Sequence, residues 1–385
     1  MQKRKVCVVL TARPSYSRFK SALQQIQTHP ELELQLVVAA SAVLDRYGNT
    51  VRYIQQDGFE IAAKVYMVLE GENLTTMAKT TGLGMIELAT AFDNLKPDVV
   101  VTIADRYETL ATAIAATYAN IPVVHVQGGE ISGSIDEKVR HAVTKLSDLH
   151  FVATQKAAER VIRMGELPER VFVTGCPSID LAAEVLANPE IDFDPFELYG
   201  GVGDRLELSE DYLIVMQHPV TTEYDLAQRH IWETLHAVQD LKIPTLWFCP
   251  NVDAGSDGTS KGIRVFREQQ QPAHIHFFKN MPPLHFLRLL YHCRSILGNS
   301  SVAIREGSFL GIPAVNIGTR QANRERGTNV VDANYDREAI VLAVQLHLRN
   351  GRAPSSTLYG DGKAGERIAQ LLAEQPLSIE KRLAY

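Results

Sequence analysis

The chain has few cysteines and no long apolar run. Its 385 residues include four cysteines, which stand singly at Cys7, Cys176, Cys249 and Cys293. Without paired spacing they indicate neither a zinc site nor a redox centre, and they are typical of buried free thiols in a reducing compartment. The apolar run after Lys5 is too short for a signal peptide, and no segment approaches the roughly 18 apolar residues of a membrane span. We therefore expect a cytoplasmic protein that binds no membrane.

An excess of charge is also lacking. The 39 Lys and Arg residues against 45 Asp and Glu give a formal net charge of −6, and no basic block is longer than Lys3-Arg4-Lys5. This balance disfavours a general nucleic-acid binder. The basic stripe Lys261, Arg264 and Arg267 is typical of a solvated helix face, with an anion-sensing surface as the alternative. Any phosphate must therefore be held locally.

The common nucleotide and metal signatures are missing. No G-x-G-x-x-G follows the first predicted strand, where the chain reads Thr11-Ala12-Arg13-Pro14-Ser15, and no G-x-x-x-x-G-K-[ST] occurs. This disfavours a nicotinamide dehydrogenase and a P-loop ATPase. No His, Cys, Asp or Glu cluster has ligand spacing, so we expect neither a metal nor a cofactor.

What the sequence does contain is a repeated alternation of short β-branched runs and longer segments of helical periodicity, which predicts an α/β fold with parallel sheets. In the first half we expect strands at 5–10, 34–40, 98–103, 123–126, 150–153 and 171–174, with helices near 18–28, 107–119, 136–145 and 154–164. A connection rich in Pro, Asp and Gly at 188–211 separates this half from a second. There, strands at 212–216, 245–248, 275–278, 295–298 and 313–316 alternate with helices near 225–239, 261–269, 283–292 and 301–310.

Ligands of such sheets bind beyond the carboxyl ends of the strands, so residues just after the strands are the candidates. Acids and bases stand there in the first half, at Asp105-Arg106 and in the segment from Gln127 through Gly128-Gly129-Glu130 to Asp136. The glycines would let a ligand approach the backbone closely. His218 follows the first strand of the second half and is a group that titrates near neutral pH. Each alone is typical of a structural residue, but together they indicate a reaction in one cleft.

Phosphate binding is indicated at two places. Arg13 offers a cationic fork after the first strand, with a surface salt bridge as its alternative role. Ser300 and Ser301 lie where a strand ends and a helix begins, so backbone N–H groups and the helix dipole favour an anion there. Glu306, little more than one turn on, is placed to accept hydrogen bonds from a ribose. The alternative is an ordinary N-cap followed by a solvated glutamate.

These motifs resemble, in order over nearly the whole chain, the hydrolysing UDP-N-acetylglucosamine 2-epimerases. The resemblance is carried by Ala12-Arg13-Pro14, Asp45-Arg46-Tyr47-Gly48-Asn49-Thr50, Ala104-Asp105-Arg106, Gly128-Gly129-Glu130, Gly175-Cys176-Pro177-Ser178, Gln217-His218-Pro219-Val220-Thr221-Thr222, Pro250-Asn251-Val252-Asp253-Ala254-Gly255-Ser256, Gly298-Asn299-Ser300-Ser301, Gly318-Thr319-Arg320-Gln321 and Tyr359-Gly360-Asp361-Gly362.

The resemblance implies a GT-B-type fold of two Rossmann-like domains facing across the active-site cleft. The first would span 1–180, the second, UDP-binding domain would span 181–363, and a C-terminal helix at 364–385 would pack back on the first. It also implies conversion of UDP-N-acetylglucosamine and water to N-acetylmannosamine and UDP, by elimination of UDP and hydration with inversion at C2, for nonulosonic (sialic) acid synthesis. A homodimer or homotetramer is implied as well.

The resemblance also implies roles for individual residues. The acid/base pool is Asp105, Glu130, Asp136 and His218, of which Asp105, Asp136 and His218 are expected to be essential. The leaving UDP would be stabilised by Arg13, Ser300, Ser301 and Arg320, the ribose held by Glu306, and the uracil contacted by Phe278, Lys279 and Asn280. Arg106, Asn251 and Asp253 complete the predicted substrate-binding set.

One position departs from the family pattern. Gln127 stands where many relatives carry Glu, and an amide is no general base. Either Glu130 or another acid takes that proton, or the substrate is the sister sugar UDP-2,4-diacetamido-2,4,6-trideoxyglucose of the legionaminic acid pathway. The same motifs also allow a non-hydrolysing 2-epimerase, a GT-B glycosyltransferase or a silent nucleotide-sugar sensor. The acid-rich wall argues against the transferase, which needs an acceptor groove more than several acids.

Overall fold

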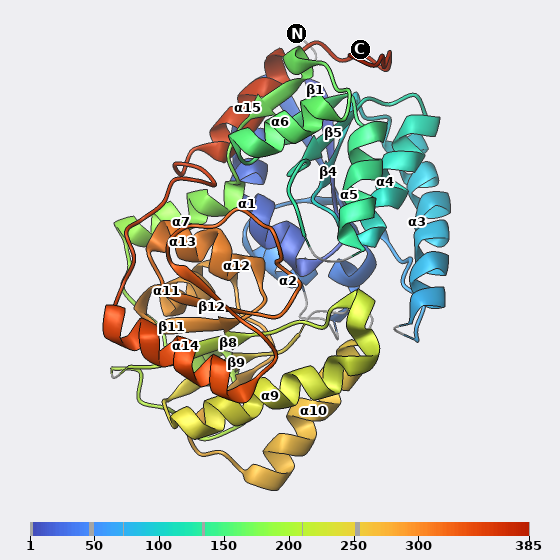
Figure 1. Ribbon diagram of the computed structural model, residues 1–385. Coiled ribbons are helices and arrows are strands. Elements are labelled where there is room, and N and C mark those ends of the chain that lie inside the picture. The colour runs from blue at the N-terminus through green and yellow to red at the C-terminus, as the bar shows by residue number, and fades with distance from the viewer. Residues whose placement is uncertain are drawn as a thin grey trace. The chain divides into compact units, whose positions relative to one another are not determined.

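The computed structural model describes residues 3–45, 50–71, 73–132, 135–209, 211–250 and 255–384. Its contacts divide the chain into two compact α/β units (Figure 1). Unit 1 comprises Met1–Glu130, Ile135–Asp180 and Tyr359–Tyr385, and unit 2 comprises Ile131–Ser134 and Leu181–Leu358. Apart from the four residues Ile131–Ser134, the chain therefore passes to unit 2 at Leu181 and returns to unit 1 at Tyr359.

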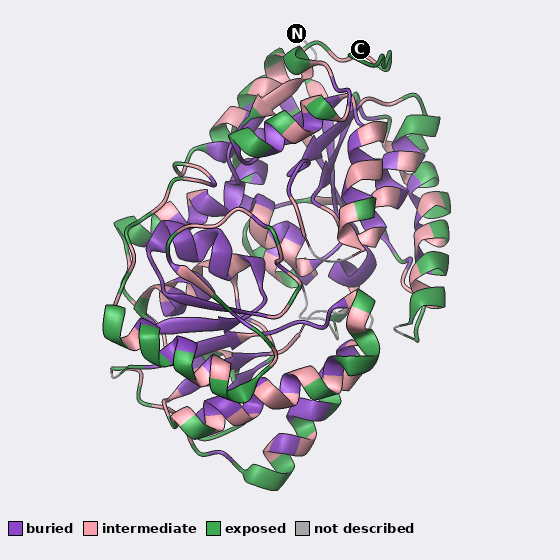
Figure 2. Ribbon diagram, viewed as in Figure 1, coloured by how far each residue is buried: buried purple, intermediate pink, exposed green. Residues whose placement is uncertain are grey.

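Unit 1 is built on a seven-stranded parallel sheet in the order β3-β2-β1-β4-β5-β6-β7. The strands are β1 (Arg4–Leu10), β2 (Leu32–Ala39), β3 (Ile61–Val65), β4 (Val99–Ile103), β5 (Val123–Val126), β6 (Leu149–Val152) and β7 (Val171–Val173). The central strands are buried on both faces (Figure 2), which explains their uninterrupted apolar runs. Because all pairs are parallel, the carboxyl ends of these strands share one edge.

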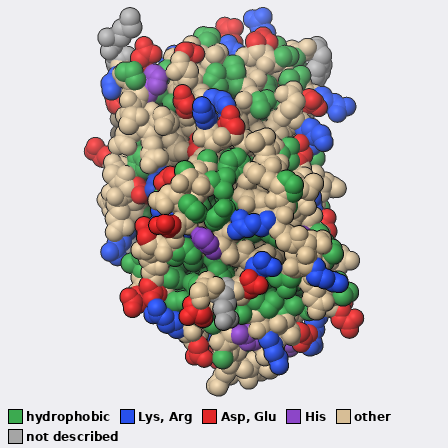
Figure 3. All heavy atoms as spheres, turned by 90° about the vertical axis from the view of Figure 1, so that its left-hand side faces the viewer, with side chains coloured by type: hydrophobic (Ala, Val, Ile, Leu, Met, Phe, Trp, Pro, Cys, Tyr) green, Lys and Arg blue, Asp and Glu red, His purple; other side chains and the backbone are tan. Residues whose placement is uncertain are grey.

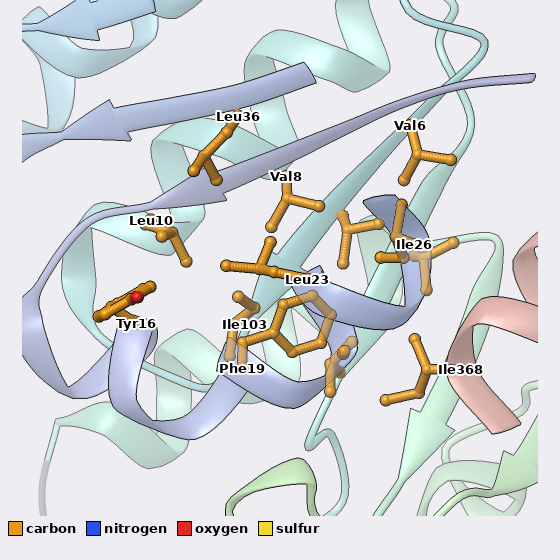
Figure 4. Packing of buried hydrophobic residues seen from close by; sticks show 14 of the residues in the cluster. Val6, Val8, Leu10, Tyr16, Phe19, Leu23, Ile26, Leu36, Ile103 and Ile368 are labelled. Atoms are coloured by element: carbon orange, nitrogen blue, oxygen red, sulfur yellow. The ribbon is translucent and has the colours of Figure 1, made fainter. Parts of the chain in front are cut away.

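The helices of unit 1 cover both faces of that sheet. They are α1 (Arg13–Thr28), α2 (Thr50–Gln56), α3 (Leu74–Leu95), α4 (Tyr107–Tyr118), α5 (Asp136–Leu146), α6 (Gln155–Arg163), the start of α7 (Pro177–Ala187) and α15 (Ala364–Glu374). Phe19, Leu23 and Ile26 of α1 point toward Val8 of β1 and Ile368 of α15 in one apolar cluster (Figure 4). The end of the chain is thereby tied to its beginning.

Unit 2 repeats the plan with a six-stranded parallel sheet in the order β10-β9-β8-β11-β12-β13. Its strands are β8 (Leu213–Met216), β9 (Thr245–Phe248), β10 (Ile275–Phe278), β11 (Ser295–Gly298), β12 (Ala314–Ile317) and β13 (Val330–Ala333). Its helices are α8 (Pro195–Tyr199), α9 (Ala227–Leu241), α10 (Ser256–Gln270), α11 (Pro283–His292), α12 (Ser301–Ile304), α13 (Glu306–Leu310) and α14 (Arg337–Asn350), together with the larger part of α7.

The structure corrects several predicted elements. The predicted helix at 301–310 is two helices, because the backbone of Arg305 turns away between α12 and α13. The predicted C-terminal helix ends at Glu374, and residues 375–384 follow without helix. The connection at 188–211 contains the short helix α8, whose first turn is capped by the Asp194 carboxylate. Strands β3 and β13 and helices α2, α3, α7 and α14 were not predicted.

Surface charge is mixed. On the face drawn in Figure 3, acidic and basic side chains are interspersed rather than gathered by sign. Lys261 and Arg264 of the basic stripe are exposed on α10. Among the described residues, none of the helices combines the length and apolar character required to cross a bilayer.

Candidate functional site

In unit 1 the predicted acids follow two neighbouring strands. Asp105 comes after β4, Glu130 closes the turn after β5, and these strands pair in parallel (Figure 1). Asp136 begins α5, the helix that follows the β5 turn, and lies in its first turn, where the helix dipole favours a carboxylate. The carboxyl edge of this sheet therefore collects the predicted acids from three elements.

The guanidinium of Arg140 binds several groups at this edge of the sheet. No role for this residue was predicted from the sequence. Arg140 is fully buried and forms an ion pair with Asp105. Its Nη1 donates to the Glu130 carbonyl over 2.7 Å and to Glu137 Oε2 over 2.8 Å. Burial by itself lowers the pKa of Arg140, but the neighbouring carboxylates, Asp105 and Glu130 first, outweigh it and raise the pKa. The cation is thus permanent, and the only sequence signal for it was its spacing of four residues from Asp136.

Gln127 is buried within unit 1 and has a left-handed backbone, with φ of 69°. Its Nε2 donates to Cys176 Sγ over 2.9 Å, and that sulfur lies 3.0 Å from Ser178 Oγ. Its Oε1 accepts no hydrogen bond from the residues that the structure describes. None of the four cysteines forms a disulfide, and Cys7, Cys176 and Cys293 are buried.

The two glycines of the β5 turn make room for atoms of the protein itself. Gly129 has φ of 73°, and a Cβ there would lie 2.2 Å from the carbonyl oxygen of Ala157 at the start of α6. A Cβ at Gly128 would lie 2.9 Å from His125 Nδ1. The space beside each glycine is therefore filled by the protein's own atoms.

The two predicted cations of unit 1 differ in their surroundings. Arg106 makes two hydrogen bonds of 3.2 and 3.1 Å to the fully buried carboxylate of Glu108, so its fork is already engaged. Arg13 is the first residue of α1, directly after the β1 strand end, and is half-buried. Arg13 thus stands at the N-terminus of a 16-residue helix, where free N–H groups and the helix dipole favour an anion.

In unit 2, His218 follows β8 and is joined to Asn299, which follows the paired strand β11. The Asn299 side chain accepts from the His218 backbone N–H over 2.7 Å and donates to the His218 carbonyl over 2.8 Å. Gly298, with φ of 122°, allows this approach, because a Cβ there would lie 2.2 Å from the Met216 carbonyl oxygen. The buried amide of Asn299 thus fixes the backbone of His218.

The same asparagine gathers the phosphate candidates. The backbone carbonyl of Asn299 accepts from Arg320 Nη1 over 3.2 Å and from Gln321 Nε2 over 2.9 Å. Ser300 is the N-cap of α12, but its side chain makes no capping hydrogen bond, so the ordinary-cap alternative does not hold. Arg320 and the Ser300-Ser301 pair are therefore neighbours at this sheet edge. Because α12 is only four residues long, its dipole is weaker than that of the predicted longer helix.

The predicted nucleoside contacts lie on the same unit. Glu306 begins α13 and is 7% exposed, and its Oε2 accepts no hydrogen bond from the described part of the chain. A buried carboxylate oxygen of this kind suits a hydroxyl donor. Phe278 ends β10 with its ring in the core, 5.7 Å from the ring of Phe248, whereas Lys279 is exposed and Asn280 half-buried. Any uracil contact of this segment falls to its backbone and to these two residues.

Two predicted residues, Asn251 and Asp253, lie outside the described residues. Within the described ranges, no group of three or more His, Cys, Asp or Glu side chains is placed to hold a metal ion.

The motif order and the sheet-edge geometry agree with a comparison against known families. A model of the family UDP-N-acetylglucosamine 2-epimerase matches residues 24–373. The chain belongs to this family.

Individual relatives of this epimerase-family chain match it over nearly its whole length. The UDP-N,N'-diacetylbacillosamine 2-epimerase (hydrolyzing) of Legionella pneumophila is 34% identical over 375 residues, 97% of each chain. The UDP-N-acetylglucosamine 2-epimerase of Neisseria meningitidis is 29% identical over 373 residues, 96% of this chain and 95% of the relative.

Solved structures show the same fold. The structure of UDP-GlcNAc 2-epimerase from Methanocaldococcus jannaschii in complex with UDP-GlcNAc and UDP matches with a TM-score of 0.79 at 20% identity, covering 96% of this chain and 100% of that one. This member of the epimerase family has an α/β fold of the GT-B type with two Rossmann-like units.

Proposed function

We propose that this protein is a hydrolysing 2-epimerase that converts UDP-N-acetylglucosamine and water to N-acetylmannosamine and UDP. The observation that carries the proposal is the group of carboxylates at the carboxyl edge of the unit 1 sheet. Asp105 and the Glu130 loop are held by buried Arg140, and Asp136 lies one turn before Arg140 on α5. Several acids in one place suit a reaction that removes one proton and returns another.

In the first stage the C2 proton and UDP leave the sugar. The C2–H bond is a weak acid, so elimination needs a base and a stabilised leaving group. The leaving diphosphate would be stabilised by Arg13, Arg320 and the Ser300-Ser301 turn. The nucleoside would be held by Glu306, Lys279 and Asn280. Charge-assisted hydrogen bonds from Arg and from backbone N–H groups are suited to this task.

In the second stage water adds across the double bond, and C2 receives its proton on the opposite face. Asp105, Asp136 and His218 are proposed as essential, with Glu130 completing the acid/base pool. Gln127 neither gives nor takes a proton at working pH, so we assign it a hydrogen-bonding role beside Cys176. The product would feed nonulosonic acid synthesis in the cytoplasm.

A second substrate is favoured by a specific observation. The Legionella pneumophila relative, named for UDP-N,N'-diacetylbacillosamine, is 34% identical over 97% of both chains. The same hydrolysing chemistry on UDP-2,4-diacetamido-2,4,6-trideoxyglucose is therefore the alternative, and it also accommodates Gln127 as the mark of a different sugar.

One incubation tests the reaction. Each UDP-sugar is mixed with the protein in D2O and followed by proton NMR. We expect UDP and a free 2-acetamido sugar of mannose configuration that carries deuterium at C2, and the sugar that reacts faster identifies the substrate. A UDP-linked epimer in equilibrium with its substrate would indicate a non-hydrolysing enzyme. If both sugars remain unchanged, the 2-epimerase proposal fails.

Assembly is measured separately. We propose a homodimer or homotetramer, and light scattering coupled to size exclusion gives the mass of the particle directly. A mass equal to the 42.7 kDa chain would contradict this.

A further inference from the structure

A buried imidazole lies directly behind the acids of unit 1. His125, on β5, is fully buried. Its Nε2 is 2.8 Å from the carbonyl oxygen of Ala104, and its Nδ1 is 3.1 Å from Thr144 Oγ1. A carbonyl only accepts, so Nε2 carries the proton and Nδ1 accepts from the threonine hydroxyl. Both ring nitrogens are therefore used by the protein itself.

This imidazole is not an acid or a base of the reaction. Burial lowers the pKa of His125 to about 3, so the ring is neutral at working pH. It has no exposed surface on which a substrate could bind. What it supplies is a fixed N–H donor with an orientation set by Thr144.

The group that receives this donor is the peptide before Asp105. Ala104 has φ of 64°, a left-handed conformation that costs an alanine roughly 1–2 kcal/mol. Its N–H donates to the Val126 carbonyl over 2.8 Å, and its C=O accepts from His125. Hydrogen bonds thus hold both the N–H and the C=O of Ala104 in this strained turn. Asp105 is the next residue along the chain.

The same ring also supports the β5 turn and α5. Thr144 and Arg140 are four residues apart on α5, so they share a face of that helix. Arg140 holds the Asp105 carboxylate while Thr144 holds His125. A Cβ at Gly128 would approach His125 Nδ1 to 2.9 Å, which shows how closely the β5 turn covers the ring. One imidazole therefore ties β4, β5 and α5 together behind Asp105.

We propose that His125 is a positioning residue for the proposed 2-epimerase reaction, and that it acts by donating a hydrogen bond to the Ala104 carbonyl and so aiming the Asp105 carboxylate. This inference rests on the proposed function. Displacement of a reacting group by about 1 Å lowers the rate on the order of 100-fold, even when the substitution that causes it lies away from the reacting atoms. Loss of this hydrogen bond should therefore lower kcat and leave substrate affinity nearly unchanged.

Two neutral amide variants separate positioning from mere packing. In His125→Gln, the side-chain amide reaches the place of Nε2 and keeps a donor to Ala104. In His125→Asn, the shorter amide reaches only the place of Nδ1, beside Thr144. We expect His125→Asn to lose about 100-fold in kcat with KM changed less than about 3-fold, and His125→Gln to stay within about 5-fold of the wild type. The deuterium isotope effect on kcat for substrate labelled at C2 should rise only in His125→Asn, because C2–H cleavage becomes slower.

A second, milder variant covers the case in which His125→Asn does not fold. Thr144→Val removes the hydroxyl that orients the ring and nearly keeps the side-chain volume. We expect a loss of about 5- to 10-fold in kcat at unchanged KM. Thr112→Val is the matched control, because Thr112 on α4 is equally buried and its Oγ1 has no hydrogen-bond partner among the described residues.

The outcomes distinguish this inference from the proposed function. Wild-type kcat and KM in His125→Asn, or equal losses in His125→Asn and His125→Gln, would overturn the positioning role while leaving the reaction intact. If the wild type turns over neither sugar, crystal structures of the two variants decide. Separation of Asp105 from Arg140 in His125→Asn alone supports the positioning role, and an unmoved Asp105 overturns it.

Discussion

Asp105 is the residue on which the proposed chemistry depends most. Its carboxylate is ion-paired with buried Arg140 and follows a strained alanine. Asp105→Asn keeps the shape and removes the basic group. We expect UDP binding within about 3-fold of the wild type and a loss of turnover of at least about 100-fold, the usual size of a lost general acid or base. UDP affinity is measured by calorimetry and turnover by UDP release.

The control for that variant is Asp93→Asn on the exposed face of α3, which should leave both quantities unchanged. If Asp105→Asn retains wild-type turnover, Asp105 has no part in proton transfer.

Arg140 contributes to the free energy of unfolding as well as to the placement of Asp105. Its removal leaves Asp105 without this cation and the Glu130 carbonyl without this donor. We expect Arg140→Met to lower the free energy of unfolding by about 3 kcal/mol, because breaking a buried ion pair strands the remaining charge. Urea unfolding measured by circular dichroism gives this value. Arg382→Met, which alters an exposed pair, should change it by less than about 0.5 kcal/mol.

At the scale of elements, two glycines differ in whether their positions could accept a side chain. Gly298 at the end of β11 has φ of 122°, and an added Cβ would overlap the Met216 carbonyl. Gly82 lies on the exposed face of helix α3, and its Cβ would meet nothing. We expect Gly298→Ala to lower the free energy of unfolding by about 3 kcal/mol or more, and Gly82→Ala to raise it by about 0.5–1 kcal/mol.

Thermal melts of the two variants beside the wild type provide the comparison. Equal effects of the two substitutions would show that the backbone of Gly298 relaxes, and that the close approach of β8 and β11 does not require glycine.

The elements that were predicted and those that were missed differ in their environment. Central strands such as β1 and β4 are buried apolar runs, and their pattern is unambiguous. Edge strand β3 is Ile61–Val65, half exposed and rich in alanine, so its own residues barely favour a strand. The split at Arg305 was hidden because neither Arg305 nor its direct neighbours Ile304 and Glu306 is a glycine or a proline.

At the scale of the whole molecule, the chain end is anchored to unit 1 by a buried polar cluster. Lys381 Nζ lies 2.5 Å from Glu166 Oε2, and Glu166 also binds His150 and Lys145. The Arg170 guanidinium adds a bond of 2.8 Å to the Pro376 carbonyl. Burial would raise the pKa of Glu166, but its three partners outweigh this and lower the pKa to about 2.

This cluster and His125 predict the acid sensitivity of unit 1. Burial lowers the pKa of both His125 and His150, so the unfolded chain takes up protons on them before the folded one does. Their contribution is complete above about pH 6.5 and is lost below it. For His125, whose pKa is lowered to about 3, the loss is about 1.4 kcal/mol per pH unit between these two values. Glu166 has a lowered pKa, so its contribution is present above about pH 4.5 and falls as the pH drops from there toward 2.

We therefore expect the stability of unit 1 to decrease steadily from pH 7 to pH 5. Hydrogen exchange of β5 and β6 amides at a series of pH values measures it within that unit. His125→Gln should reduce the slope by about 1.4 kcal/mol per pH unit, whereas His141→Gln, at a partly exposed histidine, should leave it unchanged. A flat profile in the wild type would show that neither histidine is kept neutral by the fold.

The sequence by itself determined the α/β class, the central strands, the family and the positions of Asp105, Asp136, His218 and Ser300, because strand periodicity and motif order are properties of neighbouring residues. Only the tertiary structure decided which side chains support them. These are Arg140, His125 and Asn299, whose hydrogen bonds join strands and helices that meet only when the sheet forms. A pattern of neighbouring residues therefore cannot predict them. Burial then determines their chemistry. It keeps the His125 imidazole a neutral donor, and it leaves the Arg140 guanidinium paired with Asp105, the carboxylate that the reaction is proposed to use.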